Sequence, residues 1–299
     1  MREVKTVAVI GAGTIGASWA AYFLSRGLKV RASDPAPGAE ALIARMAAGI
    51  GAGTAGLVFE RDPVRAAEGA DFVQESAPER YDVKLGLLPA VSRAVGPDVP
   101  IASSSSGLLV SRLREGCAHP GRVLIGHPFN PPHLMPLVEV VSGEGADAAA
   151  VEAAMAFYRR VEKYPIHIRK EVPGHVANRL QAALWREAVH LVAEGVASVA
   201  DVDAAISEGP GLRWALMGPS LTFHLAGGDG GMKHFLGHLL PAMQTWWDDL
   251  GTPRVDAALQ ARLVAGVEEE AAGRDLAALA ARRDRFLREL VALRRKTDG

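Results

Sequence analysis

Two shortages stand out in this sequence of 299 residues: it has a single cysteine, Cys117, and a formal net charge of only −1. A lone cysteine cannot form an internal disulfide, which favours a reducing cytoplasm as the location. Nucleic-acid-binding domains need a clustered basic excess, so a nearly neutral chain argues against that class of partner. The sequence also lacks a cysteine pair and an HExxH motif. We therefore expect a cytoplasmic protein with no nucleic-acid partner and no metal.

One segment of the sequence could be a signal peptide or a membrane span, but glycines interrupt it. Residues 6–24 carry no charge and follow Arg2 and Lys5, as in targeting segments. Three glycines nevertheless fall within six residues of this run. A spanning helix does not favour that arrangement, whereas a phosphate-binding loop requires it. We interpret the run as part of a cofactor loop and expect no membrane partner.

The length allows two domains, and the texture of the sequence changes near residue 170. Before that point, helical stretches at 17–26 and 79–95 alternate with short β-branched runs. The expected strands are 6–10, 29–32, 71–75, 100–104 and 122–126. This alternation predicts an α/β fold with a doubly wound, mostly parallel Rossmann sheet over residues 1–170. Residues 171–299 are predicted to form an all-helical domain.

Three patterns support the helical interpretation of the second domain. Ser198 and Asp201 have the spacing of a capping box at a helix start. Gly195 ends a helix whose apolar face is traced by Val176, Leu180, Leu184, Ala188 and Leu191. A final amphipathic stripe, which packs within the domain or forms a dimer face, consists of Leu276, Leu279, Phe286, Leu290 and Leu293.

The first strand leads into a dinucleotide fingerprint, GxGxxG, and then into a helix. The glycines permit a tight turn, a close approach of the backbone to a pyrophosphate, and close packing of strand on helix. Asp34 ends the next strand, 18 residues past Gly16 (34 − 16), where a carboxylate bonds the ribose hydroxyls and repels a 2′-phosphate. NAD is therefore favoured over NADP; the alternative is a glycine turn without a ligand. The expected cofactor loop consists of Gly11, Ala12, Gly13, Thr14, Ile15 and Gly16.

A second informative stretch, His127-Pro-Phe-Asn-Pro-Pro, follows a predicted strand and leads to Leu137-Val-Glu139. Ligands of open α/β sheets bind at such strand ends. These residues, together with Ala77-Pro-Glu79 through Lys84, Ala102-Ser-Ser-Ser-Ser106 and Pro173-Gly-His-Val-Ala-Asn178-Arg, resemble the L-3-hydroxyacyl-CoA dehydrogenase superfamily over nearly the whole chain.

The resemblance implies a role for each matching residue. His127 takes the hydroxyl proton and Glu139, twelve residues later, orients it, while Ser106 and Asn178 hydrogen-bond the reacting oxygen. Glu79 and Lys84 are implied on the nicotinamide side of the cofactor site, and Ser104 is expected to bind the cofactor as well. A neutral imidazole is also a suitable proton acceptor on chemical grounds alone.

Further motifs resemble the carnitine 3-dehydrogenase branch of the superfamily. They are Asp34-Pro-Ala-Pro-Gly-Ala-Glu40, Phe72-Val-Gln-Glu-Ser-Ala-Pro-Glu79, Gly211-Leu-Arg-Trp214 and the run from Ala226 to Phe235. The segment between residues 34 and 75 lacks the charged helical hairpin that acyl-CoA members carry. The chain departs from the branch at residues 245–249, which read Thr-Trp-Trp-Asp-Asp in place of a proline–tryptophan–threonine run. Gulonate 3-dehydrogenase, also known as lambda-crystallin, shares many of the same positions.

A carnitine site needs aromatic faces for a trimethylammonium group and a cation for a carboxylate. We expect Arg186 and Arg213 to meet the carboxylate, and Asn130 to contact the substrate. One or two aromatic side chains should face the site and most of the others should be core, among Trp185, Trp214, Phe223, Trp246 and Trp247. The expected activity is oxidation of a 3-hydroxyl group by a homodimer, with L-carnitine as the substrate. L-gulonate, a short 3-hydroxyacyl-CoA and a non-catalytic crystallin-like role are the alternatives.

Overall fold

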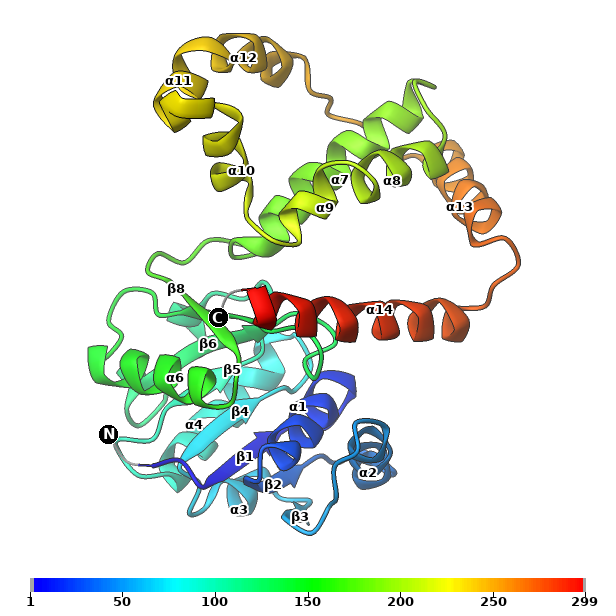
Figure 1. Cartoon of the computed structure of the whole chain (residues 1–299). Coiled ribbons are helices and arrows are strands. Elements are labelled where there is room, and N and C mark those ends of the chain that lie inside the picture. Colours follow the sequence, from blue (N-terminus) through cyan, green and yellow to red (C-terminus); the bar gives the residue numbers. More distant parts are fainter. Residues whose placement is uncertain (1–2, 298–299) are drawn as a thin grey trace. The chain divides into compact units, whose positions relative to one another are not determined.

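The computed structural model describes residues 3–297, which form two compact units that divide between Arg179 and Leu180. The first unit contains one eight-stranded sheet in the order β3-β2-β1-β4-β5-β6-β7-β8 (Figure 1). Its strands are β1 (Thr6–Ile10), β2 (Lys29–Ser33), β3 (Leu57–Glu60), β4 (Phe72–Glu75), β5 (Ile101–Ser103), β6 (Val123–Pro128), β7 (Leu137–Val141) and β8 (Tyr164–Ile168). The predicted Rossmann-type sheet is confirmed.

The five strands expected from the sequence are all present, and the sheet has three more. The pair β6–β7 is antiparallel, whereas the other strand pairs of the sheet are parallel. The three additional strands, β3, β7 and β8, are not among those predicted from the sequence pattern. In β7 a glutamate interrupts the apolar run, and β8 contains a proline and a histidine, so neither has the plain pattern of a buried strand.

Helices cover both faces of the sheet, and each face has its own hydrophobic core (Figure 1). One core joins α1 to α6 through Trp19, Phe23 and Phe157, and the other packs Leu88 and Val91 of α4 against the opposite face. Helix α1 begins three residues before its predicted start, because Gly13 is its N-cap. The helical elements are α1 (Thr14–Ser25), α2 (Ala39–Gly49), α3 (Pro63–Ala67), α4 (Tyr81–Ala94), α5 (Val110–Leu113), α6 (Ala148–Arg160) and the 3-10 turn η1 (Pro120–Arg122).

The second unit is helical, as predicted. Ser198 caps α8 by accepting a hydrogen bond from the Asp201 N–H group at 3.1 Å, which confirms the predicted cap. No described helix is long and apolar enough to cross a membrane. The helices are α7 (Ala177–Ala193), α8 (Val199–Ser207), α9 (Pro210–Trp214), α10 (Pro219–Ala226), α11 (Gly231–His238), α12 (Leu240–Asp249), α13 (Ala257–Ala271), α14 (Leu276–Thr297) and the 3-10 turn η2 (Gly228–Gly230).

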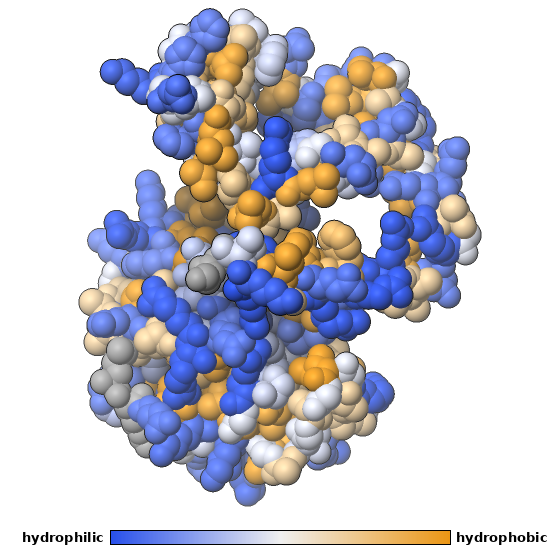
Figure 2. Space-filling model, viewed as in Figure 1, coloured by the Kyte–Doolittle hydropathy of each residue, from blue (hydrophilic) through white to orange (hydrophobic). Residues whose placement is uncertain are grey.

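Large apolar side chains remain at the surface of this helical unit (Figure 2). Helices α9, α12 and α14 have no buried residue in their described parts. In the predicted stripe of α14, Leu276 is 85 % exposed and Phe286 is 59 % exposed. Leu279 and Leu290 of the same stripe are half-buried, so the stripe is covered only in part, and the dimer face stays a prediction.

Candidate active site

The glycine fingerprint forms the turn between β1 and α1. Gly11 has a φ of +92°, and a Cβ atom there would lie 2.6 Å from the backbone of Ser76. A Cβ atom on Gly16 would lie 1.8 Å from the carbonyl oxygen of Gly11, so only glycine permits this approach of helix to strand. A Cβ atom on Gly13 would meet nothing within 4 Å, which leaves the backbone open to solvent. This is the division of roles that a pyrophosphate-binding turn requires.

The N-terminus of α1 is free to receive an anion. The helix begins with Thr14 and Ile15, its N-cap has no side-chain hydrogen bond, and its first turn contains no acidic residue. Asp34 follows β2 and holds the turn from the other side, since its Oδ2 accepts from the Ala12 N–H group at 2.7 Å. Its Oδ1 accepts from the Ala36 N–H group at 2.7 Å. Each oxygen keeps a further lone pair for a ribose hydroxyl.

His127 and Glu139 face each other directly across the antiparallel pair β6–β7. The Nδ1 atom of His127 lies 2.8 Å from Oε2 of Glu139, and both side chains are buried. This pairing explains the twelve-residue spacing, because β7 runs back along β6 after a single connection. The dyad expected from the sequence is therefore formed by two neighbouring strands.

The other carboxylate oxygen of Glu139 is held by the start of α7. The Val176 and Ala177 N–H groups each donate to Oε1 at 2.9 Å. Burial acts to raise the pKa of Glu139, but the hydrogen bonds from His127, Ala177 and Val176 outweigh it and lower that pKa. Glu139 is therefore an ionised acceptor. Asn178, the next residue of α7, is half-buried.

The Ser104–Ser106 segment follows β5, and the carboxylate of Glu79 organises it. Oε1 of Glu79 accepts from Ser105 Oγ at 2.7 Å and from the Ser106 and Gly107 N–H groups at 2.8 and 2.9 Å. Burial acts to raise the pKa of Glu79, yet these hydrogen bonds and the charge of Lys84 lower it. Glu79 thus fixes the position of Ser106, whose Oγ lies 3.4 Å from the same oxygen.

Lys84 is enclosed, with only 1 % of its side chain exposed. Its Nζ atom donates to Oε1 and Oε2 of Glu75 at 2.8 and 2.9 Å and to the Ala77 carbonyl at 3.0 Å, and it lies 3.9 Å from Glu79 Oε2. Ser103 also donates to Glu75. The lysine thereby fixes the turn that connects β4 to α4.

A buried amide, that of Gln74, lies next to this serine segment and is not among the predicted site residues. Nε2 of Gln74 donates to Ser104 Oγ at 2.9 Å and to the Gly126 carbonyl at 3.2 Å, while its Oε1 accepts from the Tyr158 hydroxyl at 2.6 Å. Ser104 also shares a hydrogen bond of 2.8 Å with Ser76 Oγ. Two consecutive polar residues in the strand Phe-Val-Gln-Glu are the signal that could have revealed this network.

The remaining expected substrate contacts belong to other segments of the chain. Asn130 is exposed in the connection after β6, and its peptide bond to Pro131 is cis. The structure places the other expected contacts in the second unit: Trp185 and Arg186 in α7, Arg213 and Trp214 in α9, and Phe223 in α10.

The expectation that most of the tryptophans are core is wrong for the second unit. Trp185 is 61 %, Trp214 37 %, Trp246 63 % and Trp247 55 % exposed. The physical reason is that the helices of this unit supply too few neighbouring side chains to cover these rings. Phe223 differs, since it is half-buried and stacks on Phe235 with ring centroids 4.6 Å apart.

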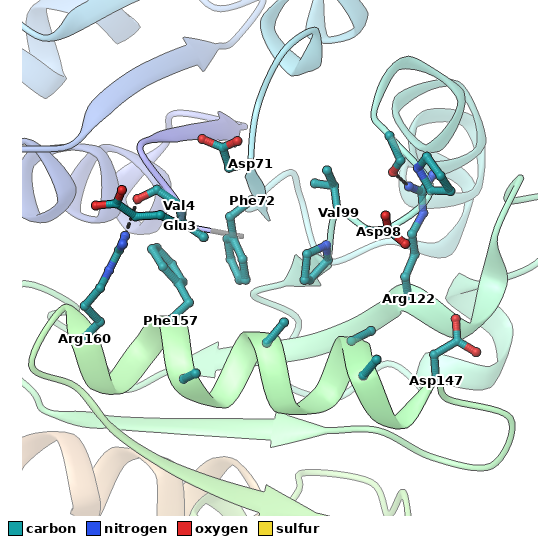
Figure 3. Close-up of a pocket in the computed structure, with 17 residues that line it drawn as sticks. Glu3, Val4, Asp71, Phe72, Asp98, Val99, Arg122, Asp147, Phe157 and Arg160 are labelled. Carbon is teal, nitrogen blue, oxygen red and sulfur yellow. Dashed lines mark hydrogen bonds between the residues drawn. The ribbon is translucent and has the colours of Figure 1, made fainter. Parts of the chain in front are cut away.

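The first unit also has a cavity of about 730 Å³, but it lies at the opposite edge of the sheet. Val4, Asp71 and Pro100 line it, and these residues precede the parallel strands β1, β4 and β5. The glycine turn, Ser76 and Ser104 instead follow the same strands. Phe72 and Phe157 form an apolar wall of this cavity (Figure 3). The cavity is therefore separate from the candidate active site.

Two family models match the chain. The 3-hydroxyacyl-CoA dehydrogenase NAD-binding domain matches residues 6–172, and the C-terminal domain of the same family matches residues 174–266. The chain belongs to the 3-hydroxyacyl-CoA dehydrogenase family. It is thus an NAD-dependent dehydrogenase acting on a CH–OH group, and the cofactor expected from Asp34 is confirmed.

This family member is similar to several curated proteins over nearly its whole length. The L-carnitine dehydrogenase of Nocardiopsis dassonvillei is 49 % identical, with 95 % of this chain and 90 % of the relative covered. That of Pseudomonas aeruginosa is 48 % identical, with 99 % and 95 % covered.

Solved structures show the same likeness. The 5-formyl-3-hydroxy-2-methylpyridine 4-carboxylic acid 5-dehydrogenase, described as an NAD+-dependent dismutase, has a TM-score of 0.79 at 30 % identity, with 99 % of both chains covered. The 3-hydroxybutyryl-CoA dehydrogenase of Escherichia coli has a TM-score of 0.66 at 28 % identity, with 89 % of this chain and 57 % of that one covered.

Proposed function

We propose that the enzyme oxidises the 3-hydroxyl group of L-carnitine to give 3-dehydrocarnitine. The observation that carries this proposal is the match, over 95 % or more of the chain, to L-carnitine dehydrogenases that are 48–49 % identical. The fold adds support, because residues 34–75 contain α2, β3 and α3 and no helical hairpin of the kind that acyl-CoA members carry. A CoA thioester is therefore the less favoured substrate.

His127 is proposed as the general base. The ionised Glu139 can only accept, so it holds a proton on Nδ1 of His127, and in the neutral ring the lone pair is on Nε2. NAD, when held by the glycine turn and Asp34, would supply the acceptor for the hydride that leaves C3 of the substrate. Nε2 takes the hydroxyl proton, the C3–O bond becomes a carbonyl, and Glu139 stabilises the imidazolium that results. The step needs no metal.

The surrounding residues are proposed to orient the two reactants. Ser106 and Asn178 hydrogen-bond the reacting oxygen, and Ser104, Glu79 and Lys84 shape the nicotinamide side. The support for Glu79 is its set of hydrogen bonds to residues 105–107, which places it beside Ser106. Lys84 acts through Glu75 and the Ala77 carbonyl, since its own ammonium group is enclosed.

The helical domain is proposed to bind the substrate and to form a homodimer in the cytoplasm. We place this substrate-binding domain at residues 171–299. The family matches at residues 6–172 and 174–266 support a boundary near residue 170. The exposed stripe on α14 supports self-association, because apolar side chains in such numbers are stabilised by burial against a partner. Light scattering of the purified chain measures the oligomeric state directly. A monomer at micromolar concentration would contradict the homodimer.

A substrate panel tests the activity. L-carnitine, D-carnitine, L-gulonate and 3-hydroxybutyryl-CoA are each incubated with NAD and the enzyme, and the absorbance of NADH is followed. We expect the highest kcat/KM with L-carnitine, and turnover of D-carnitine at least about 100-fold slower, because only one enantiomer presents its hydroxyl to His127. A higher kcat/KM with gulonate or with the thioester would remove the carnitine assignment and leave the family assignment intact.

A further inference from the structure

A second histidine, His175, lies against the His127–Glu139 dyad. His175 is 2 % exposed, and its ring centroid lies 5.4 Å from that of His127, at an interplanar angle of 58°. Its backbone φ is +52°, a left-handed conformation that is uncommon for a residue other than glycine. Such a conformation persists only where the surroundings hold it. Here the His175 N–H group donates to the Val172 carbonyl at 3.1 Å.

The partner of the ring determines its tautomer. Nε2 of His175 lies 3.0 Å from the carbonyl oxygen of Ser105. A carbonyl oxygen only accepts, so Nε2 carries a proton and donates. Nδ1 is buried and has no hydrogen-bond partner in the described part of the chain. A second proton on Nδ1 would leave a charged N–H group buried without an acceptor, so the ring stays neutral.

This ring connects the two halves of the candidate site. On one side it binds Ser105, whose neighbour Ser106 is a proposed contact of the substrate oxygen. On the other side the next two residues, Val176 and Ala177, donate their N–H groups to Glu139. The segment from His175 to Ala177 therefore holds the serine loop with its side chain and the dyad with its backbone.

We propose that His175 is a positioning residue: its neutral ring, which donates to the Ser105 carbonyl, fixes Ser106 relative to the His127–Glu139 dyad. The inference rests on the proposed function, because Ser106 and His127 are assigned there. His175 thus positions Ser106 through one hydrogen bond, whereas His127 takes the substrate proton.

Two variants separate this role from simple packing. His175→Phe keeps a ring of similar size and loses the donor, whereas His175→Gln keeps an N–H donor near the position of Nε2. We expect kcat to fall by about 10- to 100-fold in His175→Phe, through misplacement of the oxygen contact, and to stay within about three-fold of wild type in His175→Gln. The Kd for NAD should change little in both. His167→Phe is the matched control. His167 is an exposed histidine of β8, away from the site, and its Nε2 atom shares one hydrogen bond of 3.0 Å with Ser142 Oγ.

A measurement without substrate keeps this test independent of the carnitine assignment. Burial lowers the pKa of His175, as does the nearby His127, while Ser105, Glu139 and Glu79 act in the other direction. Below about pH 6.5, His175 therefore binds a proton in the unfolded chain but stays neutral in the folded chain. The free energy of unfolding should fall as the pH drops through this range. We expect this loss in the wild type, and a smaller loss in both His175 variants.

Each outcome has one meaning. A wild-type kcat in His175→Phe, or an equal loss in His175→Phe and His175→Gln, would overturn the positioning role. An unchanged slope of stability against pH in both variants would show that the ring of His175 takes up a proton as readily in the folded chain as in the unfolded chain, and would overturn the neutral donor. Failure of the proposed function would appear instead in the wild type, as an absence of turnover with L-carnitine.

Discussion

The hydroxyl of Tyr158 occupies the place where a side chain at position 126 would begin. A Cβ atom on Gly126 would lie 2.1 Å from that oxygen and 2.9 Å from Cβ of Ala102. Tyr158 is fully buried in α6, which raises its pKa, and it donates to Gln74. Because Gly126 directly precedes His127 in β6, the contact of α6 with Gly126 also fixes the backbone beside the dyad.

The first prediction tests this packing. Gly126→Ala should destabilise the protein by about 1–3 kcal/mol, since the new methyl group displaces the hydroxyl and disturbs the Gln74 network. Chemical denaturation measures the change. Gly86→Ala is the control, because a Cβ atom there meets nothing within 4 Å and the position is helical. Equal stability of the two variants would contradict the close approach.

The second prediction concerns the choice of cofactor. Asp34→Ala should weaken NAD binding and narrow the preference for NAD over NADP, because the carboxylate both bonds the ribose and repels a 2′-phosphate. Titration of both cofactors measures the two Kd values. Asp62→Ala is the control, since Asp62 also accepts a backbone hydrogen bond, from Val64 at 2.9 Å, at the start of α3. Wild-type protein that binds NADP as tightly as NAD would contradict the premise.

The third prediction concerns the proposed base. His127→Ala should lower kcat by about 10²–10⁴-fold, as removal of a general base typically does. The Kd for NAD should remain nearly unchanged, because the imidazole acts on the substrate hydroxyl. Steady-state kinetics and a binding titration give the two numbers. Wild-type turnover in this variant would require another base.

The fourth prediction links Glu139 to stability in acid. The pKa of Glu139 is lower in the folded chain than in the unfolded chain. Its ionised form therefore contributes fully to the free energy of unfolding above the ordinary glutamate pKa of about 4.3, and this contribution is lost as the pH falls below that pKa. Wild-type stability should therefore fall between about pH 5 and pH 3. Glu139→Gln should be less stable at neutral pH and should lose less across that window. Parallel slopes for the two proteins would show that Glu139 is not held as an ion.

The fifth prediction concerns the ammonium group of the proposed substrate. Trp185→Leu or Trp214→Leu keeps apolar volume and removes the π face, so KM for L-carnitine should rise. A neutral 3-hydroxy acid should be affected much less, because it makes no use of the ring quadrupole. Trp246→Leu and Trp247→Leu complete the set, and kinetics with the two substrates identify the cage. If all four variants bind L-carnitine normally, a tryptophan cage is excluded.

Sequence patterns predicted the parts of this site that depend on local chain geometry. The glycine turn and the position of Asp34 follow from short-range rules, and a family resemblance implied the pairing of His127 with Glu139. The buried network around Gln74 could not be predicted, because its partners Ser104, Gly126 and Tyr158 come from β5, β6 and α6. The exposed tryptophans were missed for a different reason: apolar character predicts burial without saying whether the same unit supplies the partner.

The pairing of His127 with Glu139 across neighbouring strands lowers the entropic cost of assembling the site. The two residues are 12 apart in sequence, whereas the bonds from Val176 and Ala177 to Glu139 close loops of 37 and 38 residues. Loop closure costs about 0.6 kcal/mol more for each doubling of length, so the longer loops cost about 1 kcal/mol extra. The proton-transfer pair thus belongs to the local contacts that form at low entropic cost during folding. The two N–H groups that orient it depend on contacts with a higher entropic cost of loop closure.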